Sequence, residues 1–220
     1  MELKEIFNFL TTLRENNNRE WFLENKVRYN QHRDSYAQFI ELLIFEISQF
    51  DGTVKGLLPK DCIYRINRDI RFSKDKSPYK THFGAYIVPG GKKSGKAGYY
   101  FHIEPGNSLV AGGIYMPETT VLKRIRQDIY ENFDEFNSIV TEEKFVSTFG
   151  GLKGDKLKTP PRGFPKDSTG IEYLKFKQFG AVAEITDEDM MVPNLLDKVI
   201  SKFRVLSSLI LYLNHIVEDV

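Results

Sequence analysis

The chain has 220 residues, of which 41% are hydrophobic and 28% charged, and its formal net charge is +1. This composition is typical of a globular protein, and no apolar run reaches the roughly 20 residues that a membrane-spanning helix needs. We expect one domain over 1–220, no membrane partner and, because no secretory signal is visible, a cytoplasmic location. A single cysteine, Cys62, excludes an intramolecular disulfide and a multi-cysteine zinc site.

Helical periodicity dominates both ends of the chain. The asparagine run 16–18 ends the first helix and can cap the second. The segment 150–170 is rich in glycine and proline and is predicted to be an irregular loop. The helices expected, in chain order, are 2–15, 19–50, 117–136, 171–177 and 193–217.

Between Asp61 and Met116 the hydrophobic period changes to two, which indicates strands. Short connections join antiparallel neighbours, and a further strand is expected at 181–185. The sequence therefore predicts an α+β fold in which an antiparallel β-meander of four to five strands packs with N-terminal and C-terminal helices. The strands expected in the meander are 62–70, 82–88, 98–104 and 108–115.

Charge is distributed unevenly along the chain. Segment 60–96 holds ten basic and three acidic residues, a local net charge of +7, and the remaining 21 basic and 27 acidic residues give −6. Such an asymmetry predicts an anionic partner for the basic segment, although internal ion pairs are the alternative for each arginine.

Alternation along the predicted strands gathers polar side chains on one sheet face, because successive side chains point to opposite faces. Guanidinium groups suit an oxyanion, and carboxylates and imidazoles can act as acids or bases. We expect this face to collect Arg65, Asn67, Asp69, Arg71, His82, Tyr86, Tyr100, His102 and Glu104.

Arg68 departs from this alternation, since it falls on the apolar side of the first strand. An unpaired buried guanidinium is too costly, so Arg68 is either at a bulge or held by an acidic partner. Gly112 and Gly113 lack side chains, which lets a ligand or another backbone approach the fourth strand closely.

The candidate catalytic residues are Asp69, His102 and Glu104, and the alternative is a solvated polar sheet face. His102 and Glu104, with Asp69 or His82, also have the residue types of a metal site. A compact signature such as H-E-x-x-H is missing, so we assign no metal ligand and no cofactor.

The loop 89–97 contains G-x-x-x-x-G-K in Gly90, Gly95 and Lys96. Ala97 replaces the residue that contacts magnesium, and a strand follows where a P-loop needs a helix, so we interpret the loop as a basic hairpin tip. Aromatic residues near the lysines leave nucleic-acid binding open. The acidic remainder makes nucleic acid the less favoured partner.

The run 65–80, RINRDIRFSKDKSPYK, resembles the signature R-x-x-R-D-x-R-F-x-x-x-[DN]-K-x-x-Y of a bacterial conserved hypothetical family, domain of unknown function 2461. Stretches 17–22, 100–105 and 112–117 support the resemblance, which extends over nearly the full length. It implies a single-domain bacterial protein and supplies no activity. The defining positions are Arg65, Arg68, Asp69, Arg71, Phe72, Asp75, Lys76 and Tyr79.

We therefore expect a protein that binds, or acts on, a small anionic ligand such as a phosphorylated one. One alternative is a non-catalytic module that binds nucleic acid or a protein through the basic hairpin. Another is a folding network, in which case Arg68→Ala unfolds the protein. The oligomeric state is not predicted. The residues assigned to anion binding are Arg65, Arg68, Arg71, Lys76 and Lys80, and those assigned to the pocket are Asn67, Tyr79, His82, Tyr86, Tyr100, Gly112 and Gly113.

Overall fold

The computed structural model describes residues 3–218, so the first position of the predicted helix 2–15 lies outside the described residues. Helical segments occupy both ends of the chain and most strands lie in the middle. In chain order the elements are α1 (Leu3–Glu15), α2 (Arg19–Glu24), α3 (Lys26–Ser48), η1 (Gly52–Val54), α4 (Pro59–Cys62), β1 (Phe83–Ile87), β2 (Gly98–Ile103), β3 (Ser108–Ile114), α5 (Thr119–Glu131), α6 (Phe133–Val140), α7 (Glu143–Phe149), α8 (Ile171–Leu174), β4 (Phe179–Ile185), α9 (Asp187–Met190) and α10 (Leu195–Glu218).

The strands form one antiparallel sheet in the order β1-β2-β3-β4, which confirms the predicted α+β class. In the register, Tyr86 pairs with Tyr100 and Gly84 pairs with His102. The alternation predicted for these two strands therefore holds, and Tyr86, Tyr100 and His102 share a sheet face.

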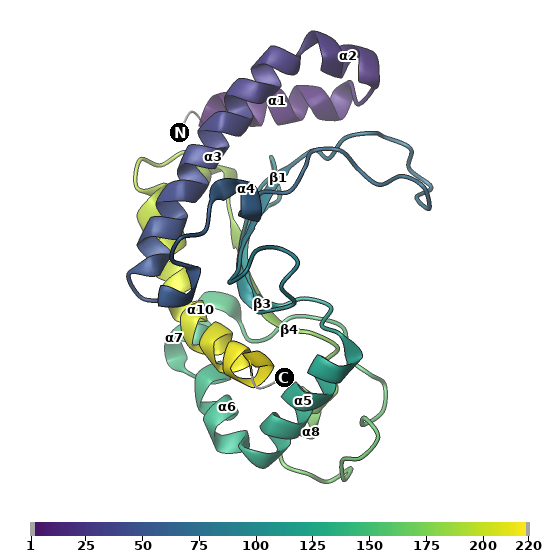
Figure 1. The fold of residues 1–220 in the computed structure, drawn as a ribbon, viewed down its shortest axis with the longest axis vertical. Coiled ribbons are helices and arrows are strands. Elements are labelled where there is room, and N and C mark those ends of the chain that lie inside the picture. Colours follow the sequence, from purple (N-terminus) through teal and green to yellow (C-terminus); the bar gives the residue numbers. More distant parts are fainter. Residues whose placement is uncertain (1–2, 219–220) are drawn as a thin grey trace.

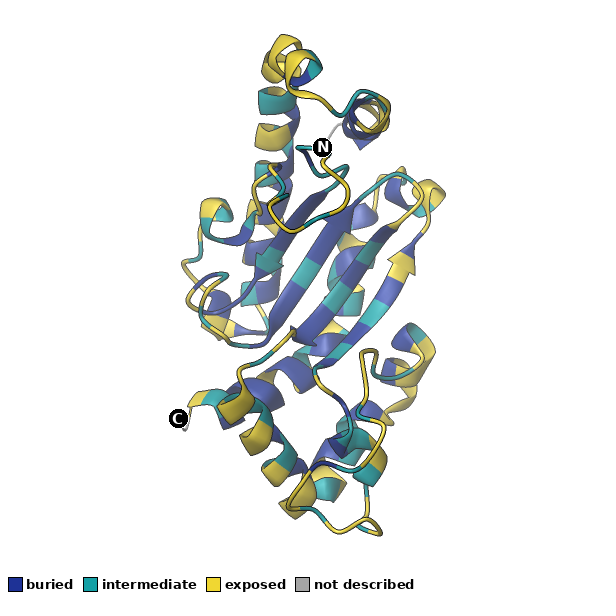
Figure 2. Cartoon of the chain, turned by 90° about the vertical axis from the view of Figure 1, so that its right-hand side faces the viewer, coloured by how far each residue is buried: buried dark blue, intermediate teal, exposed yellow. Residues whose placement is uncertain are grey.

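Helices cover the opposite sheet face, where α3 and α10 lie along the strands (Figure 1). The buried side chains of this face include Phe83, Tyr99, Phe101 and Phe179, and they join one hydrophobic cluster with the helices. The Tyr36 hydroxyl of α3 donates to the Phe101 carbonyl at 3.1 Å, which ties that helix to β2. The molecule has a C-shaped outline in Figure 1, with the polar sheet face on its concave side; this face is turned toward the viewer in Figure 2.

The second predicted helix is interrupted. The Asn18 side chain caps α2 by accepting from the Trp21 backbone N–H at 2.9 Å, as expected for asparagine at this position. Asn25 then ends α2 and precedes α3, and its side-chain amide donates to the Trp21 carbonyl at 2.9 Å. Asparagine competes for backbone hydrogen bonds, and this is a physical reason for a break within a continuous apolar pattern.

The prediction of a strand at 62–70 is wrong. Pro59 begins the short helix α4, and residues 63–82 form a projecting hairpin with isolated bridges from Ile63 to Ala85 and from Asn67 to Tyr79. Four of the seven residues from 65 to 71 are charged, and within that stretch only Ile66 is buried. A segment with so little apolar surface gains little from joining the sheet, so it stays in solvent.

The remaining elements follow the predicted order with finer divisions. The third helical region is split into α5 and α6, and α7 follows before the irregular segment 150–170. The strand expected at 181–185 is β4, and α10 corresponds to the expected closing helix. Within residues 3–218, no helix has the length and apolar character needed to cross a membrane.

Candidate functional site

The polar sheet face carries a chain of hydrogen bonds centred on His102. The Tyr100 hydroxyl lies 2.9 Å from His102 Nδ1, and His102 Nε2 lies 3.2 Å from Glu104 Oε2. These residues alternate along and just beyond β2, so all three point to the same face. His102 is buried and Glu104 is half-buried, which strengthens the electrostatic coupling between them.

The network fixes how the His102 proton is placed. Burial alone would raise the pKa of Glu104, but its hydrogen bonds outweigh burial and hold the pKa below the ordinary value. An ionised carboxylate only accepts, so Nε2–H of His102 donates to Glu104 and Nδ1 accepts from Tyr100. Burial, followed by Tyr64 and Glu104, raises the pKa of Tyr100 to about 12, so its hydroxyl remains protonated and able to donate.

Glu104 is held in place by neighbouring side chains. The Thr81 hydroxyl donates to Oε1 at 2.7 Å, and the Asn107 amide donates to Oε2 at 3.1 Å. These contacts leave the carboxylate fixed relative to the His102 ring. An arrangement of this kind is suited to moving a proton or holding a cation.

His82 completes this cluster from the adjacent strand end. Its ring centroid lies 4.3 Å from that of His102, and the potential ligand atoms of His82, His102 and Glu104 lie within 4.8 Å of one another. Burial first, and then His102, lowers the pKa of His82 to about 4, so its imidazole is neutral near pH 7. These three residues are the group among the described residues that can hold a metal ion.

Gly84 provides the space that this arrangement needs. A Cβ at Gly84 would lie 2.6 Å from the Tyr100 hydroxyl oxygen, so only glycine lets that side chain lie across β1. The role of Gly84 was not predicted from the sequence. The sequence did indicate that Gly84 lies between His82 and Tyr86 on the polar face, and a glycine there leaves room for a neighbouring side chain.

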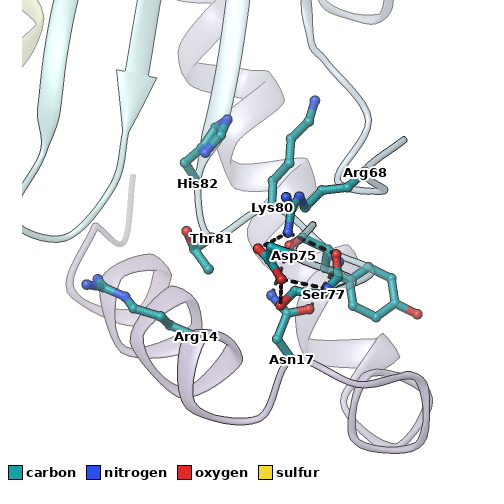
Figure 3. Close-up of a pocket in the computed structure, with 9 residues that line it drawn as sticks. Arg14, Asn17, Arg68, Asp75, Ser77, Lys80, Thr81 and His82 are labelled. Atoms are coloured by element: carbon teal, nitrogen blue, oxygen red, sulfur yellow. Dashed lines mark hydrogen bonds and ion pairs between the residues drawn. The ribbon is translucent and has the colours of Figure 1, made fainter. Parts of the chain in front are cut away.

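A pocket of about 300 Å³ lies beside the cluster, between α1 and the base of the projecting hairpin (Figure 3). In Figure 3 the cationic side chains come from different elements, Arg14 from α1 and Arg68 and Lys80 from the hairpin, and the charged ends of Arg14 and Lys80 point away from each other. Because His82 and Thr81 also line this pocket, it adjoins the histidine cluster. The remaining lining residues are Asn17, Asp75, Ser77 and Tyr79.

Lys80 has an unusual environment within this pocket. Its ammonium lies 5.3 Å from the centroid of the Tyr64 ring, and burial, followed by the charge of Arg65, lowers its pKa. It forms no ion pair with a carboxylate among residues 3–218. The cation therefore adjoins another cation and an aromatic ring but no anion.

Arg68 departs from the alternation predicted for its segment. It is held by an acidic partner, which is one of the two arrangements expected for it. Its guanidinium forms an ion pair with Asp75 and donates to the Ser77 carbonyl at 3.1 Å. Hydrogen bonds from Ser77, followed by Arg68, lower the pKa of Asp75 to about 2. Arg68 and Asp75 thus fix the shape of the hairpin beside the pocket.

Arg68→Ala is expected to leave the protein folded. The Asp75 side chain is 61% exposed, so removing Arg68 leaves that carboxylate in solvent and not buried. We expect a Tm within about 4 °C of the wild type, measured by thermal unfolding. Loss of cooperative unfolding in Arg68→Ala would instead support the folding-network interpretation.

The other residues assigned from the first predicted strand do not converge on the cluster. Asp69 and Arg71 pair with each other at 2.6 Å near the exposed end of the hairpin, and Lys76 donates to the Ile70 carbonyl at 3.0 Å. Arg65 is exposed but close enough to Lys80 to lower its pKa. The structure therefore separates Asp69 from His102 and Glu104, with which it shares no hydrogen bond.

Asn67 and Tyr79 help to build the hairpin base. They form an isolated bridge, and Tyr79 stacks on Phe22 with ring centroids 3.9 Å apart. Asn17 joins both backbone groups of Tyr79, accepting from its N–H at 3.0 Å and donating to its carbonyl at 2.9 Å. These contacts attach the hairpin to the first helices.

Tyr86, Gly112 and Gly113 lie farther along the sheet. The Tyr86 hydroxyl is 2.9 Å from the carbonyl oxygens of both Lys96 and Gly113, so it is engaged with backbone. A Cβ at Gly112 would lie 2.8 Å from Leu206 of α10, and one at Gly113 would lie 2.1 Å from the Phe179 carbonyl oxygen. The close approach that glycine permits here is therefore to a helix and to β4.

Arg14 and Asn17 line the pocket and were not assigned to it from the sequence. They lie at the end of α1 and in the following turn, and Asn17 is 62 residues away from its partner Tyr79. From the sequence, Asn17 was interpreted as part of a helix cap and of the family resemblance, and not as a pocket residue. No spacing rule links that turn to residues 77–82, because their proximity depends on how α1 packs beside the hairpin.

The fold and the site define an α+β protein with a four-stranded antiparallel sheet, whose polar face carries paired histidines beside a basic pocket. A family model described as "Conserved hypothetical protein (DUF2461)" matches residues 5–212. The chain belongs to this family, which confirms the resemblance seen in the sequence. Comparison with curated proteins gave no match, and comparison with solved structures gave none.

Proposed function

We propose that this protein binds a small anionic ligand with a phosphoryl group in the pocket formed by Arg14, Arg68 and Lys80. The observation that carries the proposal is the half-buried ammonium of Lys80, which has no carboxylate partner among the described residues. A bound oxyanion would supply the missing negative charge. Charge-assisted hydrogen bonds of this type are about twice as strong as neutral ones.

The other charges around the pocket support the same ligand chemistry. Asp75 is the acidic residue of the lining, and Arg68 already pairs with it. The Arg14 guanidinium donates to the Pro105 carbonyl at 3.1 Å, a neutral acceptor that leaves its charge available. A volume of about 300 Å³ suits a small molecule and is at the lower end for ligand pockets.

The adjoining cluster supports catalysis on that ligand as the extension of binding. Both ring nitrogens of His102 are hydrogen-bonded, so His102 exchanges a proton with a bound group by way of Tyr100 or Glu104, and Glu104 stabilises the protonated form of the imidazole. In this proposal His102 and Glu104 retain their candidate role. Asp69 is left out, because it pairs with Arg71 in the exposed part of the hairpin.

Binding of inorganic phosphate and pyrophosphate by calorimetry tests the proposal. Lys80→Met keeps the length of the side chain and removes its charge, so we expect affinity to fall about 10-fold or more. Lys93→Met is the matched control, because Lys93 is exposed on the loop 89–97. Equal affinities in wild type and Lys80→Met would contradict the proposal.

Nucleic-acid or protein binding through the basic hairpin tip at 89–97 is less well supported. Lys96 pairs with Glu218 at 2.7 Å, and the Lys92 ammonium donates to the Lys60 carbonyl at 3.1 Å. Both cations are thereby engaged within the chain. Binding of single-stranded oligonucleotides that weakens steeply with salt and is lost in Lys93→Met would favour this alternative.

A further inference from the structure

We propose that His82, His102 and Glu104 form a binding site for a divalent transition-metal ion such as Zn²⁺. The residues belong to two adjacent strand ends, and their potential ligand atoms lie within 4.8 Å of one another. Two imidazole nitrogens and one carboxylate oxygen are donor types that suit Zn²⁺ and its neighbours in the first transition series. A set of carboxylates alone would not favour a transition-metal ion over Mg²⁺ or Ca²⁺.

The spacing within the cluster fits coordination. A ligand atom lies about 2.0–2.2 Å from a bound Zn²⁺, so two ligands at a tetrahedral angle are roughly 3.4 Å apart. His102 Nε2 and Glu104 Oε2 are 3.2 Å apart. The His82 and His102 rings are tilted by 32° with their centroids 4.3 Å apart, and the ligand atoms of the three residues lie within 4.8 Å, so a small movement of His82 would bring its nitrogen to the same ion.

The surrounding hydrogen bonds orient the ligands as metal sites require. Metal-binding histidines usually direct their second ring nitrogen to a hydrogen-bond partner, and ligating carboxylates are themselves hydrogen-bonded. Tyr100 occupies Nδ1 of His102 at 2.9 Å, which leaves Nε2 for the ion. Thr81 and Asn107 hold the Glu104 carboxylate from either side.

Binding requires a change of tautomer at His102 and no change in its net charge. The ion takes the place of the Nε2 proton, and that proton moves by way of solvent to Nδ1. The Nδ1–H then donates to the Tyr100 hydroxyl oxygen, whose own O–H turns away from the ring. His82 has no hydrogen-bond partner among the described residues, so its ring nitrogens are available without breaking a bond.

Three protein ligands leave coordination positions for water or for a ligand oxygen, as in catalytic zinc sites. His82 belongs to the cluster and also lines the basic pocket (Figure 3). A bound ion would therefore adjoin the pocket. The metal proposal stands on the three ligands alone and does not depend on anion binding.

Calorimetric titration of tag-free, chelator-treated protein with Zn²⁺ tests the site. We expect one ion per chain and a higher Tm when Zn²⁺ is present, because an ion that binds the folded state stabilises it. His82→Ala and His102→Ala should weaken binding more than about 100-fold, and Tyr100→Phe should weaken it about 10-fold through the lost orientation of His102. His215→Ala is the matched control, since His215 is exposed in the last turn of α10.

A second measurement avoids the risk that a variant fails to fold. Addition of paramagnetic Co²⁺ to the wild type should broaden the imidazole NMR signals of His82 and His102 and leave that of His215 sharp. Lys80→Met should lose phosphate affinity and keep Zn²⁺ affinity, which separates this site from the anion pocket. Zn²⁺ binding unchanged in His82→Ala, or Co²⁺ broadening at His215 alone, would overturn the proposal.

Discussion

Gly113→Ala is expected to destabilise the protein by about 3–5 kcal/mol, because the added methyl group meets both a steric clash and an unfavourable backbone conformation. The added Cβ would lie 2.1 Å from the Phe179 carbonyl oxygen, which is backbone and cannot rotate away. Gly113 also has φ +123°, a conformation that residues with a Cβ rarely adopt. Both costs act on the junction between β3 and β4.

Chemical denaturation of Gly113→Ala measures this loss, and Gly163→Ala separates its causes. Gly163 has φ +93°, and no atom lies within 4 Å of the position that an added Cβ would take, so that variant reports backbone strain alone, about 1–2 kcal/mol. A Gly113→Ala variant no less stable than Gly163→Ala would show that β4 can move away.

Asn214→Leu is expected to cost about 3 kcal/mol. The Asn214 side chain, buried in α10, accepts from the Ala97 N–H at 2.8 Å and donates to the Ala97 carbonyl at 3.0 Å. Leucine removes both bonds and leaves two buried backbone groups without partners, each of which carries a desolvation cost. Because Ala97 directly precedes β2, the contact also fixes the strand that carries Tyr100 and His102.

Denaturant unfolding of Asn214→Leu should therefore show a lower midpoint with a two-state transition. Ser208→Leu places the same side chain at an exposed position of α10 and should change stability by no more than about 0.5 kcal/mol. An Asn214→Leu variant as stable as Ser208→Leu would mean that water replaces the amide at Ala97.

The polar sheet face was predictable where alternation and pairing agreed. His82, Tyr86, Tyr100, His102 and Glu104 were expected on one face, and the observed register places Tyr86 opposite Tyr100. A period of two assigns a face as soon as a segment is a strand, so the composition of that face follows from sequence. Alternation does not show which side chains on that face contact one another, because this depends on their lengths and rotamers.

The segment before β1 shows the limit of the same reasoning. Residues 62–70 alternate well enough to look like a strand, yet Arg68 breaks the pattern and Pro59 starts a helix. The correct interpretation was that Arg68 needed an acidic partner, and Asp75 supplies it from within the hairpin. The alternation was a weak signal there because the segment buries little apolar surface.

The sequence by itself determined the α+β class, the antiparallel pairing of consecutive strands, the family, and the part of the polar sheet face that lies on β1 and β2. Each of these depends on local periodicity, short connections or a contiguous signature, so neighbouring residues suffice to specify them. Only the tertiary structure decided that Arg14 of α1 and Asn17 of the following turn meet the hairpin base, and that Asp69 lies apart from His102. Those outcomes depend on packing between segments distant in sequence, where contact geometry and the cost of burying charge decide which side chains meet.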